Sequence, residues 1–84
     1  MNATKTSQCR RIVQYMLDHG SITTLEAVRD LGVLRLASRI MDLVRQGVPI
    51  ARETVMVGNR YDEMVYVTRY TIDGELPEMY RSEV

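Results

Sequence analysis

The sequence predicts a small α+β domain in which three helices precede a two-stranded β-hairpin. Residues 35–46 (RLASRIMDLVRQ) place apolar and polar side chains on two faces when wound at about 100° per residue, as in a helix with one buried face. Residues 50–57 and 65–72 are rich in β-branched and long side chains and enclose the turn-forming segment GNRYDEM. With 84 residues and a hydrophobic content of 45%, the chain suffices for one domain with one modest core.

The first helix is expected over residues 7–19. Apolar side chains recur there at helical spacing, namely Cys9, Ile12, Val13, Met16 and Leu17. Gly20 follows at the position where a left-handed residue commonly ends a helix. We expect residues 1–6 to be disordered, and Ser21 and Ile22 to form a short extended link that can pair with the later hairpin.

A capping box marks the start of the second helix. The Thr23 hydroxyl and the Glu26 carboxylate, three residues apart, can each accept a hydrogen bond from the other's backbone amide. Gly32 ends the helix after little more than two turns. Its buried face is expected to hold Leu25, Ala27, Val28 and Leu31.

The third helix separates its side chains most clearly. The apolar face is predicted to hold Leu36, Ala37, Ile40, Leu43 and Val44. The polar face holds Arg35, Ser38, Arg39, Asp42, Arg45 and Gln46. No capping residue precedes this helix, so its first amide groups are expected to bind water, the region around Gly32, or a phosphate. Gly47 ends the helix and Pro49 prevents its continuation.

The hairpin places Arg60 and Tyr61 at its tip, because both lie in the turn-forming segment between the two strands. Beyond Gly74 the sequence has a proline, several charges and little periodicity. We therefore expect residues 74–84 to form a frayed acidic tail. The alternative is a segment that docks on a partner through Leu76, Met79 and Tyr80.

Several functional classes are excluded by composition. A single cysteine (Cys9) and a single histidine (His19) can build neither a disulfide framework nor a zinc site within one chain. There is no nucleophile, histidine and acid set and no glycine-rich phosphate loop, so we expect no enzyme, catalytic residue, metal, cofactor or small-molecule ligand. The absence of a signal peptide or a long apolar run predicts a cytoplasmic protein without membrane contact.

The distribution of charge allows nucleic-acid binding although the formal net charge is zero. Residues 71–84 carry four acidic groups against one basic group, and the rest of the chain therefore carries a net charge of +3. A mildly basic body with an acidic tail is compatible with DNA. A neutral protein with charges spread for solubility is the alternative.

Three motifs indicate a family. They are GSIT at residues 20–23, the spacing RIxxLxxxGxxI that begins at Arg39, and NRY at residues 59–61. Together with the order of the elements, they make residues 8–72 resemble a small winged helix-turn-helix family found mostly in phages and prophages. The resemblance implies a domain over residues 7–73 that binds double-stranded DNA and acts in the regulation of transcription, excision or replication.

If the domain binds DNA, the third helix is expected in the major groove. Arg35, Ser38, Arg39 and Asp42 would lie nearest the bases, and Arg45 and Gln46 nearer the backbone. Arg39 is the strongest single candidate, with an ion pair to Asp42 as its alternative. Asp42 would either restrain an arginine or accept a hydrogen bond from a cytosine amino group, and the first role is favoured.

The hairpin and the second helix supply the remaining candidates. Arg60 would enter a minor groove or bind phosphate, with Tyr61 packed beside a sugar. Thr24 would donate to a phosphate. The competing hypothesis is a protein interaction or dimerisation module that keeps the scaffold without binding DNA. A homodimer is compatible with both hypotheses.

Overall fold

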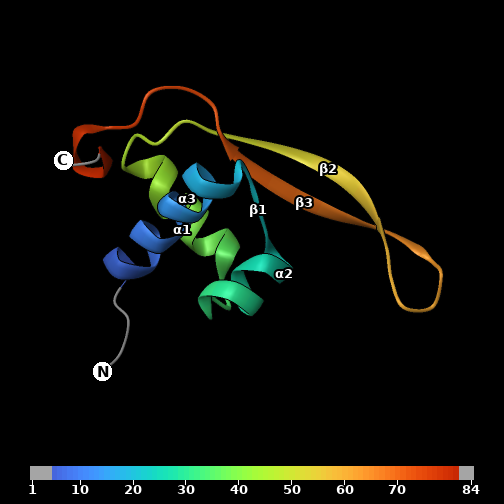
Figure 1. The fold of residues 1–84 in the computed structure, drawn as a ribbon. Helices are drawn as coiled ribbons and strands as arrows, with labels where there is room; N and C mark the ends of the chain where they lie inside the picture. The colour runs from blue at the N-terminus through green and yellow to red at the C-terminus, as the bar shows by residue number, and fades with distance from the viewer. Residues whose placement is uncertain (1–4, 82–84) are drawn as a thin grey trace.

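The computed structural model describes residues 5–81, and its helices pack together at one end of a long β-hairpin (Figure 1). In chain order the elements are α1 (Lys5–His19), β1 (Ile22–Thr23), α2 (Thr24–Glu26), the π-helical stretch η1 (Ala27–Leu31), α3 (Leu36–Arg45), β2 (Ile50–Gly58), β3 (Met64–Ile72) and the short 3-10 helix η2 (Glu78–Tyr80). None of the helices within residues 5–81 is long and apolar enough to cross a membrane.

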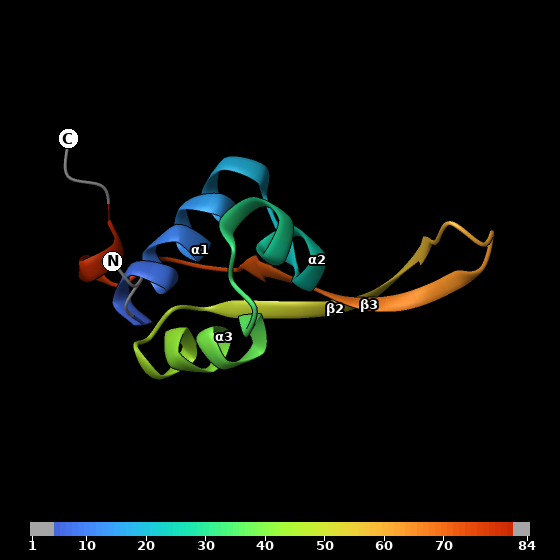
Figure 2. The ribbon, with the colours of Figure 1, turned by 90° about the horizontal axis from the view of Figure 1, so that it is seen from below.

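The sheet has the strand order β1-β3-β2, and both pairings are antiparallel. Ile22 in β1 lies opposite Tyr70 in β3, so the short link does pair with the hairpin. In β2, Ile50 lies opposite Ile72 and Gly58 opposite Met64. Both views show the hairpin extending well beyond the helices (Figures 1 and 2).

The core lies where α1 and α3 meet the base of the sheet. Its largest fully buried side chains are Ile12, Ile22, Val33, Leu36, Ile40, Leu43 and Cys9. Tyr70 is also buried, and Ile50 and Ile72 pack against the core from the same face of the sheet. This face, here called the core face, therefore determines how the hairpin is oriented relative to α3.

The expected signals at the helix ends are present. Thr23 and Glu26 form the capping box, with distances of 3.3 Å from the Glu26 amide to the Thr23 hydroxyl and 2.9 Å from the Thr23 amide to the Glu26 carboxylate. Gly32 has φ 69° and Gly47 has φ 97°, the left-handed backbone in which glycine avoids a side-chain penalty. The helix α1 begins at Lys5, so residues 5 and 6 are not disordered; residues 1–4 lie outside the described part.

The predicted buried face of the second helix is only partly correct. Ala27 is fully buried and Leu31 packs against the core, but Val28 is exposed and Leu25 is 69% exposed. In a helix, residues 25 and 27 are separated by about 160°, so burying Ala27 directs Leu25 to solvent. The small Ala27 side chain, not the larger leucine, sets the contact with the core.

The prediction of a frayed tail is wrong for residues 76–80. Tyr80 is buried, Leu76 packs against the core, and Arg10 in α1 lies over the Tyr80 ring at 5.8 Å. An aromatic ring buries a large apolar area, which is enough to hold a short segment that has no helical periodicity. Residues 82–84 of the predicted tail lie outside the described part.

The core assignment leads to a stability prediction. Leu43→Ala removes a side chain with no exposed area and should lower the free energy of unfolding by about 2–5 kcal/mol, because a cavity remains among its neighbours. Leu25→Ala is the matched control and should change it by less than about 0.5 kcal/mol. Urea unfolding followed by circular dichroism measures both. Equal losses in the two variants would contradict the assignment.

Candidate nucleic-acid interface

The outward face of α3 is more apolar than the sequence predicts. The buried stripe consists of Leu36, Ile40 and Leu43. Ala37 and Val44, which were predicted to be buried, are exposed, as are Ser38, Met41 and Arg45. The three buried residues span an arc of only about 60°, so Ala37 and Val44 lie beside the stripe rather than within it. We use the name outward face for Ala37, Ser38, Met41, Val44 and Arg45.

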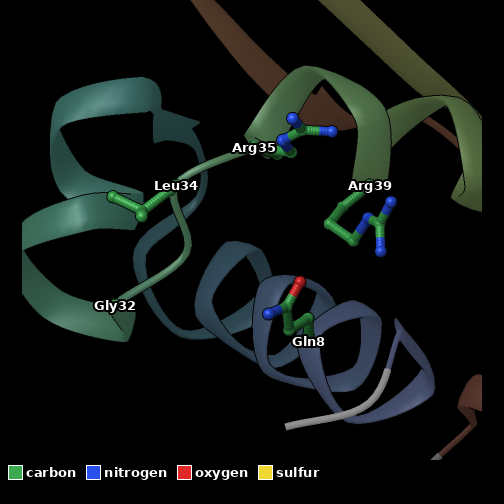
Figure 3. Close-up of a pocket in the computed structure, with 5 residues that line it drawn as sticks. All are labelled: Gln8, Gly32, Leu34, Arg35 and Arg39. Atoms are coloured by element: carbon green, nitrogen blue, oxygen red, sulfur yellow. The ribbon is translucent and has the colours of Figure 1, made fainter. Parts of the chain in front are cut away.

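Arg39 does not belong to the outward face. Its side chain is only 17% exposed and lines a cavity together with Gln8 of α1 (Figure 3). The Cys9 sulfur of α1 lies 4.0 Å from the Arg39 carbonyl oxygen, which confirms how close the two helices are at this point. The structure thus places the strongest predicted base-reading residue at the edge of α3 that faces α1.

Asp42 forms ion pairs with two arginines of α3. Its carboxylate lies 3.3 Å from Arg39 Nε and 3.6 Å from Arg45 Nη1. Arg45 remains 72% exposed, so its guanidinium can still reach a partner in solvent. The contact with Arg39 is an ion pair without hydrogen-bond geometry, since Arg39 Nε and Asp42 Oδ2 are both buried and neither has a hydrogen-bond partner within residues 5–81.

The side chain of Gln46 forms a hydrogen bond with the C-terminal segment. The Tyr80 hydroxyl donates a hydrogen bond to Gln46 Oε1, so Gln46 lies on the tail side of α3 and not toward a DNA backbone as expected. Burial and the nearby Cys9 raise the pKa of the Tyr80 hydroxyl above its ordinary value. The amide of Val48 then donates to the Leu43 carbonyl at 3.0 Å and closes the end of the helix.

Arg35 stands just before α3. It occupies the N-cap position, and no side-chain hydrogen bond caps the helix, as the sequence predicts. Arg35 is exposed and has no ion pair within the described part of the chain. Thr24, the predicted phosphate donor, is exposed at the first position of α2 beside the capping residue Thr23.

The hairpin tip is held by Asn59. Its side-chain oxygen accepts hydrogen bonds from the amides of Tyr61 (2.9 Å) and Glu63 (3.1 Å), and its side-chain nitrogen donates to the Glu63 carboxylate at 3.2 Å. Tyr61 is 72% exposed. Arg60 is also exposed, and within residues 5–81 it forms no ion pair with the neighbouring Asp62 or Glu63.

Arg52 is a candidate that the sequence reasoning missed. It lies opposite Tyr70 on the core face of β2, with its guanidinium carbon 5.8 Å from the centre of the Tyr70 ring. Figure 2 shows α3 beside the base of the hairpin, so Arg52 lies on the stretch of β2 that leads from the helices toward the tip. The alternation of Ile50, Arg52 and Thr54 on one face of a strand was the available signal.

Comparison with known proteins agrees with this architecture. The family model described as a winged helix-turn-helix domain matches residues 7–73, which is most of the chain. Neither the curated proteins nor the solved structures contain a match.

The contact between the tail and α3 can be tested with a double-mutant cycle. Tyr80→Phe and Gln46→Ala each remove one partner of the hydrogen bond, and the cycle should give a coupling energy of about 0.5–1.5 kcal/mol. Tyr66→Phe, at an exposed tyrosine without a hydrogen-bond partner in the described part, is the control and should change stability by less than about 0.5 kcal/mol. A coupling energy of zero would mean that Tyr80 does not hold Gln46 in solution.

Proposed function

Because the chain belongs to the winged helix-turn-helix domain family, a DNA-binding fold, we propose that it binds duplex DNA with the outward face of α3 in the major groove and the hairpin on the backbone or minor groove. The observation that carries this proposal is the uncovered outward face of α3 beside an extended hairpin (Figure 2).

The side chains of the outward face suit base edges. The Ser38 hydroxyl can donate or accept, and the Arg45 guanidinium can bind a guanine through two hydrogen bonds. Ala37 and Met41 offer apolar contact to a thymine methyl group. A mixed polar and apolar face of this kind is compatible with sequence reading, whereas a uniformly basic face would serve mainly backbone contact.

The remaining cations suit the phosphate backbone. Arg29, Arg39, Arg69 and Arg81 are paired with carboxylates. In the described part Arg35, Arg52 and Arg60 form no ion pair, and they lie before α3, along β2 and at the hairpin tip. The neutral net charge is consistent with DNA binding, because these three arginines form no ion pair in the described part and can present positive charge locally.

We extend the proposal to biological role on the sequence resemblance alone. A domain of phage or prophage type with this fold would act in the cytoplasm as a regulator of transcription, excision or replication. Ser38, Arg45 and Arg60 are the residues that we expect to matter most, with Arg35, Tyr61 and Thr24 in supporting contacts.

The proposal is tested by the variant Ser38→Ala/Arg45→Ala. Duplexes selected from a random pool should bind the unaltered protein, and the variant should lose about 1–3 kcal/mol of binding free energy for each base contact removed. Fluorescence anisotropy at several salt concentrations measures the affinity. Arg11→Ala removes an exposed arginine of α1 as a control for charge. Equal affinity for the double variant and the unaltered protein would reject the outward face as the reading surface.

A second candidate function is self-association through the far half of the hairpin, called here the distal wing (residues 54–58 and 64–68). It contains no charged residue. Its exposed apolar side chains are Met56, Val57, Met64, Val65 and Tyr66. Met56, Met64 and Tyr66 lie on one face of the hairpin, and Val57 and Val65 lie on the other. Exposed apolar side chains that gather on one element often mark protein contact sites.

If the distal wing mediates self-association, the protein should form an oligomer that a single charged substitution in the wing disrupts. In sedimentation experiments over a concentration series, the unaltered protein should form a dimer, and Met56→Lys should shift it to monomer because a buried unpaired charge is costly. The exposed substitution Met41→Lys on α3 is the control and should leave the dimer intact. A protein that stays monomeric at all concentrations would remove this candidate.

A further inference from the structure

A cavity lies between α1 and the start of α3, and base reading by the outward face of α3 does not require it. It has a volume of about 400 Å³ and is lined by Gln8, Gly32, Leu34, Arg35 and Arg39. Figure 3 shows Gln8 rising from α1 toward the side of α3 that carries the two arginines. On α3, Arg39 lies about 100° around the helix axis from Ser38, so the cavity opens at the edge of the outward face and not on it.

We propose that this cavity binds a phosphate group. Its lining contains two guanidinium groups and one amide and no carboxylate. Guanidinium groups are planar, remain charged at any accessible pH, and match the geometry of phosphate oxygens through paired hydrogen bonds. The Gln8 amide adds a neutral donor opposite the arginines.

The arrangement of Arg39 supports a ligand. A guanidinium has five N–H donors, and the one ion pair of Arg39 in the described part reaches it through Nε at 3.3 Å without hydrogen-bond geometry. Asp42 therefore orients the side chain but leaves most of its donors unused. Of the Arg39 side-chain nitrogens, only Nε is both buried and without a hydrogen-bond partner in the described part, so the other N–H groups of this side chain, which is 17% exposed, can bind an anion in the cavity.

Arg35 supplies uncompensated positive charge at the same cavity. Within residues 5–81 it has no carboxylate partner, whereas the charge of Arg39 is offset by Asp42. The cavity thus carries a net positive charge even though the chain as a whole is neutral. Leu34 at the rim is 77% exposed and adds an apolar wall.

A phosphate group alone would not fill a cavity of this size, and two sources share its chemistry. One is a backbone phosphate of duplex DNA, held as the strand passes the edge of α3. The other is a free phosphorylated small molecule. Only the first source rests on the proposed function; the phosphate site itself does not.

Inorganic phosphate tests the site directly. In NMR spectra recorded at constant ionic strength, sodium phosphate should shift the side-chain signals of Gln8, Arg35 and Arg39 in a saturable way that sodium chloride does not reproduce. Arg35→Ala should weaken this binding about tenfold or more, as expected for losing hydrogen bonds to a charged group. Arg11→Ala, which removes the same charge elsewhere on the surface, should change it less than about twofold.

The possible results separate the two sources. No saturable shift with phosphate, or equal weakening by Arg35→Ala and Arg11→Ala, overturns the site. Duplex DNA that moves the same three signals, with binding weakened by excess phosphate, supports the backbone source. DNA that binds without moving them overturns that source and assigns the site to a free phosphorylated molecule. Phosphate binding without any DNA binding would support the phosphate site and reject the proposed function.

Discussion

The packing of Leu36, Ile40 and Leu43 against α1 and the sheet is the constraint on which the rest of the structure depends. These three side chains are almost completely buried and form a stripe narrower than the apolar pattern of the helix. Because the stripe is narrow, rotation of α3 about its axis is fixed, and with it the identity of every outward side chain. The chain ends α3 at Gly47 and Val48 and enters β2 two residues later, so the packing of α3 also orients the hairpin.

Ion pairs restrain several arginines without preventing each of them from contacting a partner. Asp42 is the clearest case, since one carboxylate contacts both Arg39 and Arg45 but leaves the second mostly in solvent. Exposed pairs such as Arg69 with Glu53 contribute little to stability, yet each neutralises a cation that would otherwise be available to a polyanion. A neutral chain can therefore present positive charge locally, before α3, along β2 and at the hairpin tip.

The C-terminal segment is part of the domain rather than an appendage. Tyr80 lies under Arg10 of α1 and donates to Gln46 at the end of α3, which ties together two helices that also form the walls of the phosphate cavity. The opposite end of the molecule is organised differently. There the distal wing extends beyond the packed body and exposes apolar side chains (Figure 1), while Val55, Val57 and Val67 at its base line a pocket together with Leu25 of α2 and Arg29 of η1.

Local signals in the sequence were sufficient wherever the cause of a structure is local. The capping box of Thr23 and Glu26, the helix ends at Gly32 and Gly47, and both hairpin strands within one residue follow from backbone preferences and alternation. The family and its fold followed from the same elements in order. Local signals did not predict four other features. These are the burial of Ala27 in place of Leu25, the exposure of Ala37 and Val44, the orientation of Arg39 toward α1, and the packing of Tyr80 against the core. Each depends on how closely another segment approaches, and that distance is set by the whole core, whereas a periodic pattern specifies only an angle around one helix.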